Sequence, residues 1–277
     1  FAQYLLALYY AVGKGEVEQN WMDAFRYFKA AADQGHAQAQ FYTARCYFSG
    51  NGTVQSDTSA VHYYQLAAEQ GYADAQYRLA QCHEKGWGIV TNQTEYGATD
   101  SLALLEKSVP YYITAAENGQ AEAQYFLAKY HQHKNETEYH RYLHMAADQD
   151  HLGALRRVLD SFSDDSENMA GVLKYNKAAA DLGDPACQFE TGYAYRHGEG
   201  TEKDFGEALK YLHMGAAQGN MEAIEELGEM YQEGEGVKVN MPNAAHWFKI
   251  AADDMSSCSR SYFHLRRLES EGKIPEL

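Results

Sequence analysis

Basic residues, prolines and long apolar runs are all scarce in this chain of 277 residues. Its 23 lysines and arginines face 39 acidic residues, so the net charge is −16. Such an acidic balance disfavours binding to nucleic-acid phosphates and to anionic membrane surfaces. No run of about 18 apolar residues occurs, so no membrane insertion is expected. From these shortages we expect a basic or apolar partner instead.

Linker-like composition is also missing. Only four prolines occur, and the apolar content of 45% is spread evenly along the chain. We therefore expect one continuous domain over residues 1–277. No secretion leader is recognisable, and the first residue is Phe1 rather than Met, so we expect a fragment or a processed product.

Repetition is the dominant positive feature. Two alanines followed by polar residues, and in most copies by Gly, recur every 31 to 48 residues. The copies are Ala31–Gly35, Ala67–Gly71, Ala115–Gly119, Ala146–Asp150, Ala179–Gly183, Ala216–Gly219 and Ala251–Met255. Periods of about 20–50 residues are typical of solenoids. The predicted repeats are about 1–35, 36–71, 72–119, 120–150, 151–183, 184–219 and 220–255, with 256–277 as a C-terminal cap.

Each repeat carries the pattern of two short helices. In the second repeat, apolar and small residues recur at helical spacing from Ala39 to Tyr47 and again from Ala60 to Ala68. A Gly-x-Gly turn such as Gly50–Gly52 separates the two stretches, because glycine permits positive φ where the chain reverses. Expected N-caps of second helices are Asn20, Ser56, Asp204 and Asn240. Asp184 should cap a first helix that begins with Pro185.

A small residue lies midway along most first helices and leaves room for close helix packing. These residues are Ala7, Ala44, Ala80, Ala128, Gly192 and Gly228. Helical pairs with such contacts can stack into a superhelix.

The best-preserved units resemble Sel1-like repeats, which are relatives of the tetratricopeptide repeat. The resemblance is carried by Ala223–Tyr231, the turn Gly234–Val237 and Ala244–Ala252, and it extends over essentially the whole chain. It implies an all-α, right-handed α/α superhelix of about seven repeats plus a C-terminal capping helix. It also implies a non-enzymatic adaptor or scaffold in signalling, endoplasmic-reticulum quality control or bacterial–host interaction. No catalytic residue and no cofactor are expected.

The resemblance also places a candidate partner-binding groove, since first helices line the concave face of tetratricopeptide repeats. Positions three residues before the small residue are Tyr4, Phe41, Tyr77, Tyr125, Arg156, Phe189 and Glu225. Neighbouring groove positions are Gln38, Arg45, Asp74, Gln81, Lys129, Tyr193, Glu222 and Glu229. A ladder of aromatic side chains is suited to gripping an extended peptide or a helix. The alternative is that these aromatics only pack the repeats together.

The C-terminal end of this groove is acidic. Glu222, Glu225, Glu229 and Glu233 share one helix face, which favours a basic segment in the partner. A solvated face of an acidic protein is the alternative interpretation.

Two repeats and one loop depart from the pattern. The fourth repeat lacks the Gly-x-Gly turn, and the fifth has Leu159 where a small residue is expected. We expect a local change of superhelical curvature around residues 130–170. About 12 extra residues in the third repeat, Thr91–Leu102, predict a protruding loop that is either a tolerated insertion or a contact loop.

Chemistry is sparse, and it supports only one alternative function. His131, His133, His140, His144 and His151 cluster in the irregular region, and His140 and His144 are spaced to ligate zinc on one helix face. No second paired motif completes a metal site. An enzyme or a metal- or ligand-binding protein that uses the fourth and fifth repeats is therefore the alternative to a scaffold.

The compartment is not determined by the sequence. Cys46 and Cys82 occupy equivalent positions of neighbouring repeats, too far apart for a disulfide, so free thiols are expected. Asn-x-Thr sequons begin at Asn51, Asn92 and Asn135. A soluble protein, either secreted or translocated by bacteria or present in a eukaryotic secretory lumen, fits these features. Self-association is a further use of the same surfaces.

Overall fold

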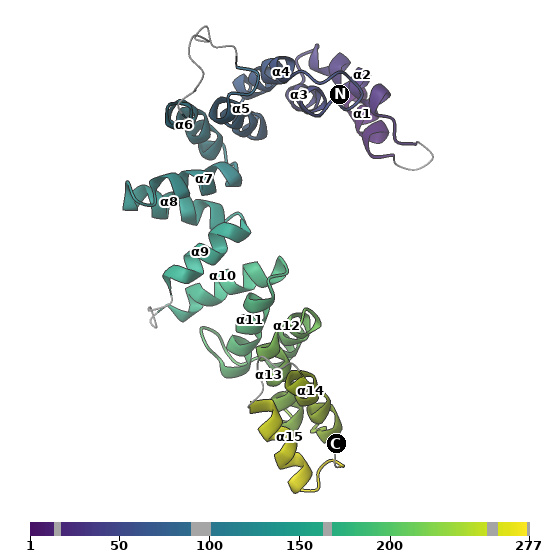
Figure 1. Ribbon diagram of the computed structural model, residues 1–277, viewed down its shortest axis with the longest axis vertical. Coiled ribbons are helices and arrows are strands. Elements are labelled where there is room, and N and C mark those ends of the chain that lie inside the picture. Colours follow the sequence, from purple (N-terminus) through teal and green to yellow (C-terminus); the bar gives the residue numbers. More distant parts are fainter. Residues whose placement is uncertain (14–17, 90–100, 163–167, 254–259, 276–277) are drawn as a thin grey trace. The chain divides into compact units, whose positions relative to one another are not determined.

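The computed structural model describes residues 1–13, 18–89, 101–162, 168–253 and 260–275, and all 15 regular elements in these ranges are α-helices. The predicted all-α class is thus confirmed. The chain divides into two compact units, Phe1–Ala146 and Ala147–Leu277 (Figure 1). The expectation of one continuous domain, with its repeat boundaries, stays a prediction.

The helices are short, at 10 to 17 residues. The first unit contains α1 (Ala2–Val12), α2 (Trp21–Ala32), α3 (Ala37–Ser49), α4 (Asp57–Glu69), α5 (Ala73–Lys85), α6 (Ser101–Glu117), α7 (Ala121–His131) and α8 (Glu136–Ala147), which ends one residue beyond it. The second unit contains α9 (Leu152–Ser161), α10 (Met169–Asp181), α11 (Pro185–His197), α12 (Phe205–Ala217), α13 (Met221–Glu233), α14 (Met241–Asp253) and α15 (Arg260–Ser270). No helix in the described ranges is both long enough and apolar enough to cross a membrane.

Within each unit the helices pack in chain order. In the first unit α1 packs on α2, α3 on α4 and α5 on α6, and each second helix also contacts the next first helix. In the second unit α11 packs on α12, α13 on α14, and α14 on α15. The cores are rich in alanine and aromatic side chains, with Phe28, Tyr64, Leu212 and Phe248 almost fully buried. Such short helices depend on this packing for their stability.

The predicted caps are present. The Asn20 side chain accepts hydrogen bonds from the backbone N–H groups of Met22 and Asp23 at the start of α2. Ser56, Asp204 and Asn240 cap the second helices of their repeats in the same way. Asp184 caps α11, which begins with Pro185.

The second glycine of three Gly-x-Gly turns has a packing role as well as a conformational one. Gly52 has a φ of 70°, and a Cβ atom there would lie 2.0 Å from the carbonyl oxygen of Trp21. A Cβ atom on Gly88 or Gly200 would lie 2.4 Å from the carbonyl oxygen of Asp57 or Met169, at the starts of α4 and α10. These three turns therefore pack directly on the N-terminus of the preceding second helix, where only glycine fits.

A recurrent glutamine joins four of the repeats to the one before them. The Gln76 side-chain amide donates to the carbonyl oxygen of Ala68 at 3.1 Å, and Gln188 donates to Ala180 at the same distance. Gln40 and Gln124 bond Ala32 and Ala116 in the same way. These bonds satisfy carbonyl groups that a helix C-terminus leaves without an intrahelical partner.

The small first-helix residues allow the close contact expected of them. Ala44, Ala80 and Ala128 are completely buried. A Cβ atom on Gly228 would lie 2.5 Å from the Phe248 ring of α14. The close approach is to the second helix of the same repeat.

The irregular repeats agree only in part with expectation. Residues 132–135 form the turn between α7 and α8 without the Gly-x-Gly pair. Most of the predicted loop 91–102, namely residues 91–100, lies outside the described residues. Its last two residues, Ser101 and Leu102, begin α6, so the predicted end of the loop was wrong. The predicted change of curvature over 130–170 concerns the junction of the two units and stays a prediction. Cys46, Cys82 and Cys187 are buried free thiols, as expected.

Candidate partner-binding faces

The first two aromatic groove residues belong to the core. Tyr4 is 9% exposed and stacks on the His36 ring at 4.9 Å. Phe41 is 7% exposed and packs against Tyr64 and Tyr72. The packing alternative fits both positions, since they leave little surface for a partner.

Further along the first unit the aromatic positions are more open. Tyr77 on α5 and Tyr125 on α7 are half-buried. The Gln81 side chain donates to the Tyr77 hydroxyl at 3.0 Å, and the Lys129 ammonium lies 4.8 Å from the centre of the Tyr125 ring. An aromatic ring flanked by a polar or charged side chain is thus repeated on two neighbouring first helices.

The polar groove positions of this unit lie on its surface. Gln38, Arg45 and Asp74 are exposed, and Lys129 is exposed as well. Arg45 and Gln81 line a pocket of about 250 Å³ beside the turns that follow α3 and α5. A second pocket, of about 240 Å³, also includes Arg45 and lies against Leu8 and Trp21. Of the polar candidates of this unit, Arg45 and Gln81 therefore lie at a concave surface.

In the second unit the corresponding face begins on α11. Phe189 and Tyr193 are half-buried, and their ring centres are 5.9 Å apart. The His197 ring stacks on Tyr193 at 4.0 Å. These rings form a short aromatic ridge along α11.

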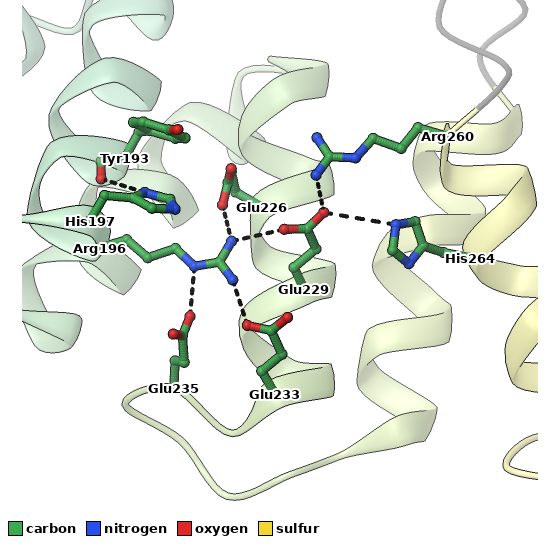
Figure 2. Close-up of polar contacts among 9 residues, drawn as sticks. All are labelled: Tyr193, Arg196, His197, Glu226, Glu229, Glu233, Glu235, Arg260 and His264. Atoms are coloured by element: carbon green, nitrogen blue, oxygen red, sulfur yellow. Dashed lines mark hydrogen bonds and ion pairs between the residues drawn. The ribbon is translucent and has the colours of Figure 1, made fainter.

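The acidic end of the groove is organised around an arginine that was not among the predicted site residues (Figure 2). Arg196 on α11 is only 5% exposed, and its guanidinium group points toward four carboxylates. It pairs with Glu226, with Glu229 at 3.0 Å, with Glu233 at 2.9 Å and with Glu235 at 2.6 Å. Burial lowers the pKa of Arg196, but the hydrogen bonds that its guanidinium group donates to Glu235 and Glu226 outweigh this and raise the pKa.

The C-terminal helix contacts one of these four carboxylates, Glu229, from the other side. Arg260 on α15 pairs with Glu229, and Nε2 of the His264 ring lies 3.8 Å from the Glu229 carboxylate (Figure 2). The Ser261 hydroxyl donates to Glu225 at 2.6 Å. Of the four predicted acidic-wall residues, Glu222 is exposed, whereas Glu225, Glu229 and Glu233 are bonded within the chain. The preference for a basic partner at this end stays a prediction. The negative charges of Glu229 and Glu233, on which it partly rests, are paired with Arg196 and Arg260 within the chain.

A signal for Arg196 was present in the sequence. Arg196 stands two residues before the turn glycine, where the corresponding residues of α1, α3, α5 and α13 are Ala11, Phe48, Glu84 and Gln232. The next first helix carries Glu226, Glu229 and Glu233, which share one face at spacings of three and four. A lone cation beside such a stripe predicts an ion-pair cluster between neighbouring helices.

The histidines of the irregular region form no metal site in the described part of the chain. No group of three or more His, Cys, Asp or Glu side chains there is arranged to hold a metal ion. The His140 and His144 rings of α8 are 6.4 Å apart, and His140 lies 4.0 Å from Glu136. His131 packs against Tyr142. The metal-binding alternative therefore gains no support from this geometry.

Two solved structures are similar to this chain over nearly its full length. One is the crystal structure of c5321, a protective antigen of uropathogenic Escherichia coli strains with an SLR fold, at 27% identity and a TM-score of 0.56. That match covers 99% of this chain, which spans 57% of the length of the Escherichia coli protein. The other is a Sel1 repeat protein from Oxalobacter formigenes, at 26% identity and a TM-score of 0.53, covering 96% of this chain and 75% of that one. No curated protein matches the chain.

The Sel1 repeat family model matches more than half of the chain. The matched ranges are 1–36, 37–72, 73–99, 121–134, 185–220 and 222–254. The unmatched stretch 135–184 contains the end of the fourth repeat and the whole of the fifth, the two that were identified as irregular. Together with the helical hairpins and the solved relatives, these matches show that the chain belongs to the Sel1 repeat family.

Proposed function

We propose that this protein is a non-enzymatic adaptor that holds a protein or peptide partner against the first-helix face of its repeats. Sel1 repeat proteins generally mediate protein–protein interactions, and the family is typically non-catalytic.

The observation that carries the proposal is the presence, in each unit separately, of half-buried aromatic side chains on the first helices. Tyr77 and Tyr125 in the first unit, and Phe189 and Tyr193 in the second, are packed on one side and open on the other. Rigid aromatic side chains held in this way bind partners at a small cost in conformational entropy. Charged neighbours such as Lys129 help to orient the bound partner.

Signalling and bacterial–host interaction are the settings proposed for this adaptor. The similarity to a protein described as a protective antigen of uropathogenic strains supports the second of these.

The proposal is tested by affinity capture from extracts of the source organism, followed by mass spectrometry. The bait is the full chain with Tyr77→Ala and Tyr125→Ala combined. The matched control combines Tyr63→Ala and Tyr139→Ala, two half-buried tyrosines on second helices of the same unit. Truncating an aromatic anchor in an interface typically costs about 2 kcal/mol or more.

We expect the wild type and the control to retain the same partner and the Tyr77/Tyr125 variant to lose it. Retention by all three baits would place the interface elsewhere. Failure of the wild type to capture any protein would contradict the adaptor function itself.

A further inference from the structure

The pocket beside Arg45 is built by two neighbouring repeats of the first unit. Helices α3, α4 and α5 and the turns after α3 and α5 enclose about 250 Å³. Its lining consists of Arg45, Phe48, Ser49, Asn51, Tyr64, Arg78, Gln81, Cys82 and Trp87. The lining thus includes two cations and no carboxylate, although the chain as a whole has a net charge of −16.

Both arginines of the pocket lack an acidic partner within the described ranges. The Arg78 guanidinium donates to the Gln81 side chain at 2.9 Å, and Arg45 lies 5.6 Å from the centre of the Tyr42 ring. The other two arginines of the unit behave differently: Arg26 pairs with Asp23 at 3.2 Å, and Arg141 pairs with Glu138 at 3.0 Å. Positive charge is therefore concentrated, and left uncompensated, at this pocket.

Tyr64 adds a phenol group to the lining of the pocket. The residue as a whole is 2% exposed, but its hydroxyl oxygen is not among the fully buried side-chain atoms that lack a hydrogen-bond partner in the described structure. Burial raises the pKa of this hydroxyl, and the charges of Arg78 and Arg45 act to lower it, so the hydroxyl lies within the field of both cations. A ligand in the pocket that accepts a hydrogen bond is a partner for such a hydroxyl group.

One wall of the pocket is apolar and aromatic. The Phe48 and Trp87 rings are 5.3 Å apart, and the Trp87 side chain is partly exposed. One carboxylate near this lining is that of Asp57, whose charge raises the pKa of the Cys82 thiol. Asp57 forms no ion pair with Arg45 or Arg78 in the described structure. The pocket therefore combines two guanidinium groups, a phenol donor and an aromatic wall.

We propose that this pocket binds an aspartate or glutamate side chain of a peptide segment in the partner, with an apolar residue beside it against Phe48 and Trp87. Guanidinium groups bind carboxylates through charge-assisted hydrogen bonds, and Tyr64 adds a neutral one. The inference rests on the proposed adaptor function and assigns a chemistry to its partner. It places the acidic part of the partner on the first unit.

The test is selection of random nine-residue peptides displayed on phage against the full chain. The selected peptides are then synthesised with a fluorescent label, and their affinities are measured by fluorescence polarisation. The test variant combines Arg45→Ala and Arg78→Ala. The control combines Arg26→Ala and Arg141→Ala, which removes the same charge from exposed positions of the same unit.

We expect the selected peptides to carry Asp or Glu next to a large apolar residue. Their affinity for the Arg45/Arg78 variant should fall about tenfold or more, because two charge-assisted contacts are lost, and should stay within about twofold for the control. Circular dichroism of both variants should match the wild type, since all four side chains are at the surface.

Replacing the acidic residue of a selected peptide by its amide should weaken binding to the wild type and not to the Arg45/Arg78 variant. If the selected peptides lack acidic residues, or bind the Arg45/Arg78 variant as tightly as the wild type, the carboxylate site is wrong and the adaptor function stands. If no peptide binds the wild type, the carboxylate site is wrong, whereas the adaptor function is decided separately by the affinity capture described above.

Discussion

The Arg196 guanidinium group on α11 lies 3.0 Å from the Glu229 carboxylate on α13, so two neighbouring first helices of the second unit are joined by an ion pair whose arginine is buried. The same guanidinium group reaches Glu226, Glu233 and Glu235. Glu229 in turn contacts Arg260 and His264 of α15. Arg196, together with Arg260 at Glu229, thus offsets the mutual repulsion of these carboxylates.

Replacing Arg196 by Ala should destabilise the second unit strongly. Removing one partner from a buried charge cluster leaves uncompensated carboxylates and typically costs about 3–5 kcal/mol. Hydrogen exchange of the α11 and α13 amides measures the loss directly. Lys210→Ala is the control, because its pair with Glu207 at 2.9 Å is exposed and such pairs contribute about 1 kcal/mol or less. Equal losses in the two variants would show that the Arg196 cluster contributes little.

The turn glycines allow a matched comparison of packing and backbone strain. Gly35 and Gly52 both have positive φ, at 86° and 70°, but a Cβ atom on Gly35 meets nothing within 4 Å. Gly35→Ala should therefore cost only backbone strain, about 1 kcal/mol. Gly52→Ala should cost about 1–3 kcal/mol more, because the turn must move away from Trp21. Urea unfolding of the two variants provides the comparison, and similar midpoints would contradict the packing role of Gly52.

Three cysteines should be unreactive in the folded protein. Burial raises the pKa of Cys46 and of Cys82 to about 11 and that of Cys187 to about 12. Because the thiolate is the nucleophile, alkylation by iodoacetamide near neutral pH should leave all three unmodified until denaturant is added. A Thr58→Cys variant, exposed on α4, supplies the reactive reference. Native labelling of Cys46 at the rate of that reference would refute the prediction.

Asp184 should make the stability of the second unit depend on pH in the acid range. Burial raises its pKa, but hydrogen bonds from the backbone N–H of Cys187 and from Arg156 outweigh this, so the pKa lies below its ordinary value of 3.8. A carboxyl group with a depressed pKa in the folded state stabilises fully above its ordinary pKa. That contribution is lost as the pH falls through the folded value.

The Asp184→Asn variant should lack this part of the acid dependence while keeping the helix cap, since Asn is also a good N-cap. The free energy of unfolding, measured by urea unfolding at pH values from neutral to about 3, checks this prediction, because that interval includes the ordinary pKa of aspartate. Asp204→Asn, at the cap of α12, is the control for a cap without an ion pair in the described structure. An unchanged slope in Asp184→Asn would contradict the assignment.

Local features were predicted well because neighbouring residues decide them. Asn20, Ser56 and Asp184 cap helices through their own side chains, and Gly50 and Gly52 adopt positive φ because the reversal occurs within a few residues. The repeat spacing identified the family for the same reason, since each helical hairpin is a short-range unit.

The groove was predicted less completely. Counting along the repeats placed Tyr4 and Tyr77 in one series, yet Tyr4 is closed over by His36, Phe28 and Tyr42 whereas Tyr77 is half-open. The position of a residue within its repeat does not determine how much of its side chain the neighbouring repeat buries.

By itself the sequence determined the helical hairpins, their caps and turns, and membership of the Sel1 repeat family, because these depend on residues close together in the chain. The tertiary structure alone decided which charges are compensated. Arg196 meets carboxylates 30 to 39 residues away, whereas Arg45 and Arg78 meet none among the described residues. Electrostatic pairing depends on distance in space, and only the packing of one repeat on the next brings such groups together or keeps them apart.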